Sequence, residues 1–339
     1  MKTLVTGIAG MIGSHLADRM IAGGWCVTGV DDLSTGLREH VNDDVKFTKG
    51  DASVYMRQAD YCYGDDLQTE RPDVIFHLAA RLGPADVLAD PLACLHEHQE
   101  HAITACELAK ATGAILVLAS SSEVYGYSTA TPFREDAPLL IGPSHLPRCS
   151  YAISKLMVEH IGMAYHRQHG VKVIIPRFFN VVGKRQRLGF VLPIFARQAL
   201  AGQPMTVHGD GSARRCFTWV EDAVEALIRL VDNPEAQGKI VNVGANRPSV
   251  QMVTAAKAIR ARASVAYGIP IAPIEYVPYE TTGDVAWANF SVRIPDTLKL
   301  KCLTGMTFED RWGKIVEDVV DDQAVQLGMV HKEIDGASA

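Results

Sequence analysis

The sequence lacks several features by which common classes of protein are recognised. Its seven cysteines form no C-x-x-C pair, so neither a zinc site nor a disulfide framework is indicated. Lysine and arginine (33) do not outnumber aspartate and glutamate (39), and a net charge of -6 disfavours nucleic acid, whose phosphates are bound mainly by basic residues. No stretch of 18 apolar residues occurs, and the apolar run in the opening MKTLVTG is too short for a signal peptide. We therefore expect a cytoplasmic protein without a metal, a membrane span or a nucleic-acid partner.

What is present is an ordinary globular composition with an alternating pattern. Hydrophobic residues make up 47% and charged residues 21% of the 339 residues, a length that suggests two domains. Up to about residue 180, short apolar runs alternate with longer segments of helical period. The expected strands are 3–6, 26–30, 45–48, 73–79, 114–120 and 171–177, and the expected helices are 11–23, 91–111 and 151–168. This alternation predicts an α/β fold with a doubly wound parallel sheet of the Rossmann type.

The chain changes character after about residue 180. Prolines and glycines spread through stretches such as AGQPMTVHGDGS and GIPIAPIEYVP. We therefore expect a sheet domain over 1–180, joined by a later segment at about 210–245, and a smaller, loop-rich lobe over 181–335. VLPIFARQAL and VEALIRLV have helical period and are expected to be core helices.

A glycine-rich loop follows the first expected strand. The stretch T-G-I-A-G-M-I-G places Gly7, Gly10 and Gly13 where the first helix begins, and glycine lets main-chain N–H groups approach a pyrophosphate there. The second strand ends in Asp31 and Asp32, where an acid would bond the ribose hydroxyls of a dinucleotide; the alternative is that Asp31 caps a turn. Because an acid at this position repels a 2′-phosphate, the pattern favours NAD over NADP.

Polar motifs also follow the next two strands. Gly50-Asp51 comes after the third strand and H-L-A-A (77–80) after the fourth. The carboxyl ends of parallel strands share one edge of a sheet, so we expect both motifs to lie at the cofactor.

Two stretches carry the chemistry. Tyr151 and Lys155 in Y-A-I-S-K are four residues apart on an expected helix, so the ammonium can lower the pKa of the phenol and make Tyr151 a general base for an alcohol. S-S-S-E-V-Y-G (120–126) places Glu123 where a buried strand ends. An ionised carboxylate there is either solvated in a loop or held for chemistry.

Together these motifs resemble the extended short-chain dehydrogenase/reductases that modify nucleotide sugars. The resemblance covers nearly the whole chain and rests on 6–13, D-D-L-S-T-G (31–36), 77–80, 120–126, Tyr151/Lys155, R-F-F-N (177–180) and V-H-G-D-G-S-A-R-R-C-F-T (207–218). It implies that Tyr151 takes the proton of a sugar 4-hydroxyl while NAD takes hydride from C4.

The resemblance also implies a role for each matched residue. The implied catalytic residues are Tyr151, Lys155, Ser121, Glu123 and Arg215. The implied NAD-binding residues are Gly7, Gly10, Met11, Ile12, Gly13, Asp31, Asp32, Asp51, Ala52, Leu78, Ala79, Ala80, Tyr151, Lys155 and Phe178. The implied contacts to a nucleotide-diphosphate sugar, a UDP-sugar above all, are Ser122, Asn180, His208, Arg215 and Arg293.

The reaction that follows the 4-ketone stays open between three types. Glu123 and Arg215 resemble UDP-glucuronate decarboxylases, whereas A-A-R-L-G-P (79–84) and R-I-P-D (293–296) resemble UDP-sugar 4-epimerases. A sugar 4,6-dehydratase also carries the glutamate, but often with an aspartic acid where this chain has Ser122. We favour the decarboxylase, with the 4-epimerase next; an NAD-binding regulator without catalysis is the non-enzymatic alternative.

Histidines occupy a helix position where the family has N-x-x-G-T. This chain reads His98, Gln99, Glu100, His101, Ala102, with His96 just before. We expect surface or interface histidines rather than metal ligands, because His96 points away from the other two. Family members are commonly dimers through helices that would include 91–111 and 151–168, so we expect a homodimer.

Overall fold

The fold is described by a computed structural model that covers residues 1–62, 71–147, 149–278 and 292–330. Its centre is an eight-stranded sheet in the order β12-β7-β5-β4-β1-β2-β3, with β6 paired to β7 and every pairing parallel. The strands are β1 (Lys2–Thr6), β2 (Cys26–Asp31), β3 (Lys46–Lys49), β4 (Val74–His77), β5 (Ile115–Leu118), β6 (Ser120–Ser121), β7 (Lys172–Phe178) and β12 (Lys239–Val243). The predicted doubly wound sheet is confirmed.

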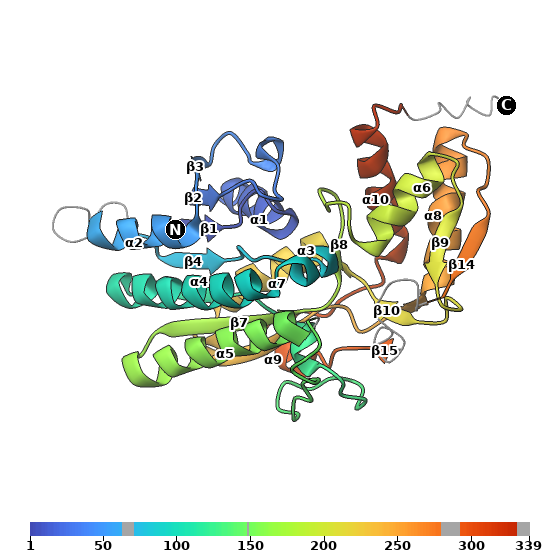
Figure 1. The fold of residues 1–339 in the computed structure, drawn as a ribbon. Coiled ribbons are helices and arrows are strands. Elements are labelled where there is room, and N and C mark those ends of the chain that lie inside the picture. Colours follow the sequence, from blue (N-terminus) through green and yellow to red (C-terminus); the bar gives the residue numbers. More distant parts are fainter. Residues whose placement is uncertain (63–70, 148, 279–291, 331–339) are drawn as a thin grey trace.

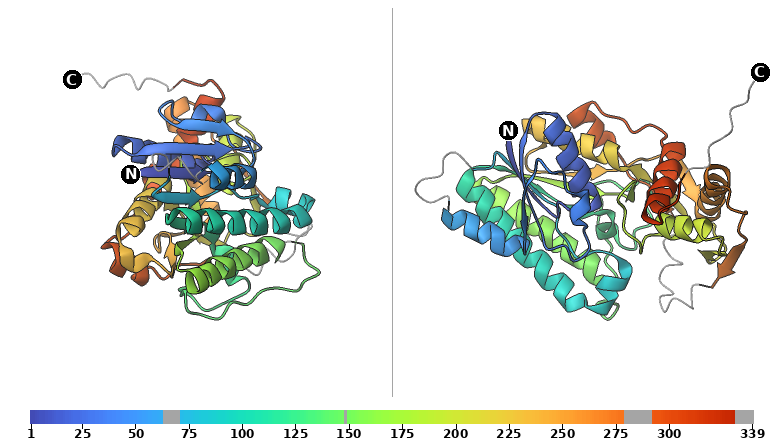
Figure 2. Two further views of the ribbon diagram at one scale, coloured as in Figure 1. Left: turned by 90° about the vertical axis from the view of Figure 1, so that its left-hand side faces the viewer. Right: turned by 90° about the horizontal axis from the view of Figure 1, so that it is seen from above.

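Helices cover both faces of this sheet (Figure 1). One face carries α2 (Ala52–Cys62), α4 (Pro91–Thr112) and α5 (Cys149–His169), which lie side by side and bury residues such as Leu108 and Val158. The other face carries α1 (Met11–Ala22), α7 (Val220–Asp232) and α9 (Leu298–Thr304), around Leu16 and Leu227. The rotated views in Figure 2 show the sheet between these two layers. Strands buried on both faces explain the near-continuous apolar runs in the sequence.

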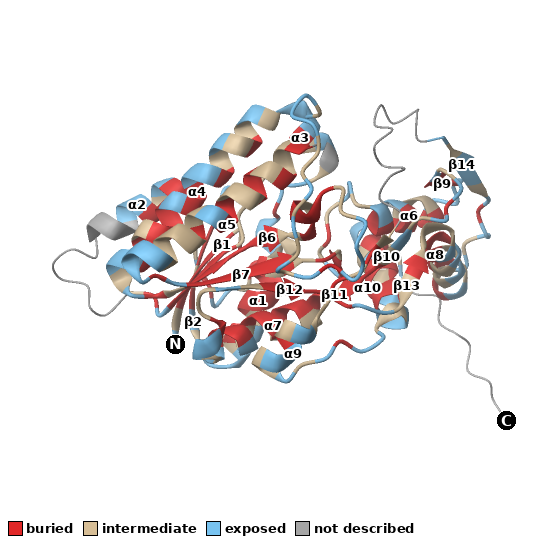
Figure 3. Ribbon diagram, turned by 90° about the horizontal axis from the view of Figure 1, so that it is seen from below, coloured by how far each residue is buried: buried red, intermediate tan, exposed pale blue. Residues whose placement is uncertain are grey.

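A second lobe is built mainly from helices. Its elements are α6 (Val191–Leu200), α8 (Met252–Tyr267), α10 (Trp312–Gln326), β9 (Met205–His208), β10 (Arg214–Cys216), β13 (Ser249–Gln251), β14 (Ile274–Val277) and β15 (Val292–Arg293). The lobe was expected to be loop-rich, yet α6, α8 and α10 pack on one another around alanines that include Ala196, Ala256 and Ala324. Small side chains let helices approach closely, and Figure 3 shows the buried residues gathered in both lobes.

The chain passes between the two lobes rather than finishing one before the other. After β7 it forms β8 (Val181–Val182), which pairs with β11 (Thr218–Trp219), and then returns to the sheet through α7 and β12. The remaining short elements are α3 (Pro84–Ala89) and the 3-10 helices η1 (Arg38–His40), η2 (Ser122–Tyr125) and η3 (Pro234–Ala236). Among the helices described here, none is both long enough and apolar enough to cross a membrane.

Candidate active site

The sequence motifs meet at the carboxyl edge of the sheet, where the strand order reverses between β1 and β4. In open α/β sheets this is the position at which ligands bind. The Thr6 hydroxyl at the end of β1 lies 2.8 Å from Nδ1 of His77 at the end of β4, and the Ala79 N–H donates to the same hydroxyl at 3.3 Å. The glycine loop and the H-L-A-A motif are thereby fixed against each other.

The glycine loop fits a pyrophosphate. Gly7 has φ +74°, and a Cβ there would lie 2.7 Å from the Ala79 nitrogen; a Cβ at Gly13 would lie 2.3 Å from the Gly7 carbonyl oxygen. Only glycine therefore allows this tight packing of loop on helix. The first turn of α1, which begins with Met11 and Ile12, contains no acidic residue and no side-chain cap at Gly10. Its N–H groups and helix dipole suit an anion.

Asp31, at the end of β2, holds the glycine loop by accepting main-chain hydrogen bonds. Its two carboxylate oxygens accept hydrogen bonds from the Ala9 N–H (2.9 Å) and the Leu33 N–H (2.8 Å), and burial raises its pKa. Each oxygen keeps a second lone pair, so the carboxylate can also accept from a ribose hydroxyl. The expected turn-capping and cofactor roles are therefore compatible. Asp32, by contrast, is exposed and accepts from Ser34.

Asp51 begins α2. It accepts from the Val54 N–H (2.9 Å) and the Ser53 hydroxyl (2.6 Å), and Ala52 behind it is buried. Burial opposes its ionisation, but these hydrogen bonds and the nearby His101 hold its pKa below the usual value.

Tyr151, Lys155 and Ser121 come together beside this edge. Lys155 is 4% exposed and donates to the Ala119 carbonyl at 2.9 Å, and the Ser121 hydroxyl interacts with the Tyr151 hydroxyl. Phe178 lies at the end of β7, opposite Ser121 on β6. Helix α5 thus brings the base and the ammonium to one place, and β6 brings the hydroxyl.

The electrostatics differ from the expectation that Lys155 lowers the pKa of Tyr151. Burial raises the pKa of Tyr151, and Glu123 raises it further, while the Ser121 hydroxyl lowers it. Burial lowers the pKa of Lys155 to about 8, against smaller opposing effects of Cys94 and Glu159. Desolvation is thus the dominant effect on both groups in the protein alone. NAD, when bound, supplies a hydride acceptor and a positive charge that would favour the phenolate.

Glu123 is paired rather than solvated. Arg293 donates to its carboxylate through Nη1 (2.8 Å) and Nη2 (3.3 Å), and the Arg293 side chain is 4% exposed against 38% for Glu123. The two residues are 170 positions apart, so no spacing in the sequence predicts the pair, although both were named separately. Arg215 on β10 stands in register with Arg293 on β15 and donates to the Arg214 carbonyl.

The other residues expected to contact substrate or cofactor differ in burial and in the element that carries them. Asn180 has φ +37° and its amide donates to the Cys216 carbonyl at 3.2 Å, which joins the end of β7 to the second lobe. Ser122 is buried within η2, and His208 is exposed at the end of β9. Leu78 and Ala80 flank Ala79 in the loop after β4. The Leu78 N–H donates to the Thr6 carbonyl at 3.1 Å.

The expectation of surface histidines is wrong for His98 and His101. They are 2% and 9% exposed, because α4 packs between α2 and α5 and turns these residues inward. His101 faces Asp51 at 3.3 Å and contacts the His77 ring edge-on, and His98 lies against α5. His96 is exposed, as expected. The residues covered by the structure hold no cluster suited to a metal ion.

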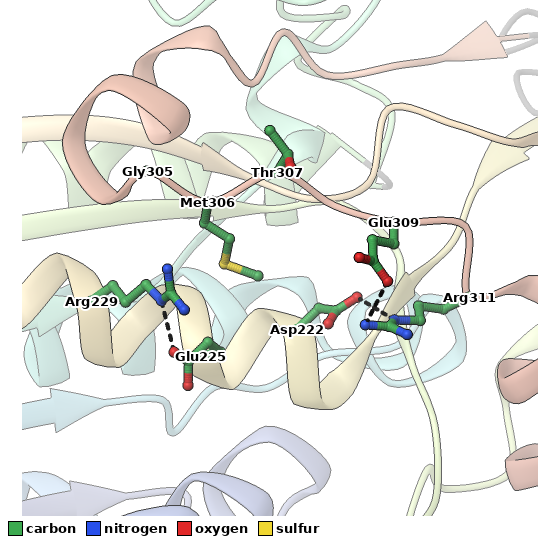
Figure 4. Close-up of a pocket in the computed structure, with 8 residues that line it drawn as sticks. All are labelled: Asp222, Glu225, Arg229, Gly305, Met306, Thr307, Glu309 and Arg311. Carbon is green, nitrogen blue, oxygen red and sulfur yellow. Dashed lines mark hydrogen bonds and ion pairs between the residues drawn. The ribbon is translucent and has the colours of Figure 1, made fainter.

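A separate pocket lies between α7 and the segment after α9 (Figure 4). Its charges are already paired, since Arg229 contacts Glu225 at 2.7 Å and Arg311 contacts Glu309 at 3.0 Å. It shares no residue with the site above and provides no unpaired basic group for a diphosphate.

Comparison with known proteins gives a family match and several similar proteins. The model of the NAD dependent epimerase/dehydratase family matches residues 3–244. The UDP-N-acetyl-alpha-D-glucosaminuronate decarboxylase of Bacillus cytotoxicus is 34% identical over 304 residues, which are 88% of this chain and 90% of that protein. UDP-glucuronic acid decarboxylase 1 of Danio rerio is 36% identical over 234 residues, 68% of this chain but only about half (54%) of that longer protein.

A solved structure is similar over almost the full length. The UDP-glucose 4-epimerase of Thermus thermophilus, in complex with NAD, has a TM-score of 0.77 at 26% identity and covers 95% of this chain, with 99% of its own chain matched.

Proposed function

This chain belongs to the NAD dependent epimerase/dehydratase family, and from that premise we propose that it decarboxylates a UDP-hexuronate through a transient 4-keto sugar. The observation that carries the proposal is the Glu123–Arg293 pair, a carboxylate and a buried guanidinium 2.8 Å apart next to the base Tyr151. A 4-epimerase reacts only at C4 and needs no charged pair near C5. Decarboxylation breaks the C5–C6 bond and does need charged groups there.

The first step uses the groups of α5 and β6. Tyr151 takes the proton of the sugar 4-hydroxyl, Ser121 holds the 4-oxygen, and Lys155 supplies a nearby positive charge. NAD, held at the glycine loop and Asp31, would supply the acceptor for the hydride of C4 and the source from which that hydride is restored. The ketone at C4 makes the C6 carboxylate a β-keto acid.

The second step is the loss of carbon dioxide. The C5–C6 bond breaks, its electron pair moves onto the 4-oxygen as an enolate, and the Tyr151 and Ser121 hydroxyls stabilise that oxygen by donating hydrogen bonds. A proton from water is then added to C5 in place of the lost carbon dioxide, hydride is returned to C4, and Tyr151 returns the proton to the 4-oxygen. Glu123 and Arg293 orient the carboxylate and the proton donor at C5.

A 4-epimerase is the second candidate, favoured by the loop after β4. In that loop Arg81 donates to Glu97 of α4 at 2.7 and 3.1 Å, so its charge is already paired where decarboxylases carry a Ser-Pro-rich substrate loop. The 26% identity to a UDP-glucose 4-epimerase is consistent with this alternative.

To test the proposal, the protein is mixed with NAD and incubated with one substrate at a time: UDP-glucuronate, UDP-N-acetylglucosaminuronate or UDP-glucose. The products are read by mass spectrometry and proton NMR. Loss of carbon dioxide from either acid supports the proposal; unchanged mass with an inverted C4 proton signal refutes it in favour of the epimerase. Retained NAD without any turnover would indicate the non-catalytic regulator.

Two variants separate the two steps. Tyr151→Phe is expected to abolish turnover while leaving bound NAD detectable by absorbance, and Tyr165→Phe, which only loses a bond to Glu107, serves as its control. Glu123→Gln is expected to keep 4-hydroxyl oxidation, seen as reduced NAD, but to slow decarboxylation by about 100-fold. Equal loss of both steps would contradict the role given to Glu123.

We further infer a cytoplasmic homodimer formed through α4 and α5. The support is the exposure of Leu92 (69%) and Ile103 (37%) on α4. Sedimentation of the protein and of a Leu92→Glu/Ile103→Glu variant tests the dimer, which should dissociate in the variant.

A further inference from the structure

We propose that His98 is a positioning residue for Tyr151 and that it acts through the hydroxyl of Ser154. The inference rests on the proposed function, because it assigns Tyr151 the role of base.

The contacts form a continuous path from one helix to the other. Nδ1 of His98 on α4 lies 2.7 Å from the Ser154 hydroxyl on α5, and that hydroxyl donates to the Tyr151 carbonyl at 2.9 Å. The His98 ring also contacts the Tyr151 ring edge-on, with centroids 5.8 Å apart and planes at 73°. His98 therefore contacts the aromatic ring of the base directly and reaches the main chain that carries the base through Ser154.

His98 can support this contact as a neutral ring. The serine hydroxyl has one proton; when that proton is donated to the Tyr151 carbonyl, Nδ1–H of His98 donates to the serine oxygen. Nε2 of the ring is buried as well, and the main chain of Arg81 lies close enough to bond the imidazole.

The surroundings keep His98 uncharged. It is 2% exposed, and the groups facing it from neighbouring elements include Lys155 on α5 and His77 on β4. Burial first, and then the Lys155 ammonium, lower its pKa to about 2. A neutral imidazole next to the ammonium of Lys155 can hold Tyr151 in place without taking up its proton.

Position matters because the phenol must face the sugar hydroxyl at hydrogen-bonding distance. A displacement of about 1 Å in such a group can cost about 10²-fold in rate. Tyr151 lies in the first turn of α5, near the helix end, where the main chain has fewer hydrogen bonds to hold it. The His98–Ser154 contact supplies an anchor there from outside the helix.

The experiment compares His98→Leu, which keeps most of the volume but no polar atom, with His98→Asn, which keeps a donor but loses volume. We expect His98→Leu to lower kcat about 10²-fold with KM changed less than about threefold, and His98→Asn to stay within about tenfold of the parent. The opposite order, with leucine the more active, would show that His98 only packs and would overturn the proposal.

Two further variants sharpen the result. Ser154→Ala should reproduce the loss seen in His98→Leu, and the double variant should be no worse than the poorer single variant; losses that multiply would contradict action through Ser154. The control His166→Leu removes a similar histidine bond, from Nδ1 to the Val171 carbonyl at 2.8 Å, at the far end of α5 and should leave kcat unchanged.

A readout without substrate separates this inference from the proposed function. The titration of Tyr151 is obtained as the phenolate absorbance difference between the parent and Tyr151→Phe. If no nucleotide sugar is converted but His98→Leu shifts this titration, the proposed function fails and the positioning role stands. If kcat and the titration are both unchanged in His98→Leu, the positioning role fails.

Discussion

Lys155 is a buried cation whose removal should stabilise the protein while abolishing its activity. It is 4% exposed, its ammonium donates to one carbonyl, and burial lowers its pKa from 10.5 to about 8. A difference of 10.5 − 8, at 1.36 kcal/mol per unit, corresponds to about 3 kcal/mol of unfavourable free energy when the lysine is charged in the folded state. Lys155→Met removes that cost and keeps the length of the side chain, but it loses the hydrogen bond to Ala119, worth about 1 kcal/mol. We therefore expect a gain of about 2 kcal/mol in the free energy of unfolding at pH 7.

The gain should depend on pH with a defined sign. Because the folded-state pKa is lowered, the cost is fully present below about pH 8 and disappears as the pH rises toward 10.5, where the unfolded chain also releases its proton. Between these values the parent gains stability relative to Lys155→Met by up to about 1.4 kcal/mol per pH unit, so its deficit shrinks.

Urea unfolding of the cofactor-free protein at several values between about pH 6.5 and 10 measures the difference. Lys172→Met is the matched control, since Lys172 also donates to one carbonyl, that of Gly113, but is exposed; its stability should change little at any pH. A Lys155→Met variant that is less stable than the parent at pH 7, or a difference that does not change with pH, would refute the reasoning.

Three further predictions follow from contacts described by the structure. Glu159 and Arg177 are each 2% exposed and are joined by two hydrogen bonds of 2.8 Å. Glu159→Gln leaves the buried guanidinium without its charged partner and should lower the free energy of unfolding in urea by about 3–5 kcal/mol; a loss below about 1 kcal/mol would contradict this prediction. Asp31→Asn replaces a carboxylate that accepts two main-chain hydrogen bonds by an amide, and it should weaken the affinity for NAD about 10- to 100-fold in calorimetric titration. An unchanged affinity would refute the role given to Asp31. Gly13→Ala places a methyl group 2.3 Å from a main-chain oxygen and should abolish NAD retention, whereas Gly313→Ala, also in a first helical turn but with open space around it, should not; equal behaviour of the two would refute the steric argument.

The local elements of the sheet domain were predictable from the sequence. Strands buried on both faces produce apolar runs, and amphipathic helices produce the period between them, so the expected helix 11–23 is found at Met11–Ala22 and 151–168 at Cys149–His169. The glycine loop, Asp31 and the Tyr151/Lys155 pair could also be selected as candidate site residues, because each pattern depends on residues that are close in sequence.

Features that depend on long-range contacts were not predictable. The Glu123–Arg293 pair joins two segments 170 residues apart, and the inward orientation of His98 and His101 depends on α4 packing between two other helices. The pKa of Tyr151 was predicted in the wrong direction for the protein alone, since spacing reveals the neighbouring charge but not the burial that outweighs it.

The return of the chain to the sheet through β12 has a consequence for biosynthesis. Residues Lys239–Val243 cover the edge of β7 by pairing with Ile174–Phe178, so that edge stays open until a further stretch of about 60 residues has left the ribosome. An uncovered, apolar strand is a template for pairing with other chains. The nascent protein therefore has a defined window of aggregation risk that closes only with β12, and a fragment ending near residue 180 would remain in that window permanently, dependent on chaperones or insoluble.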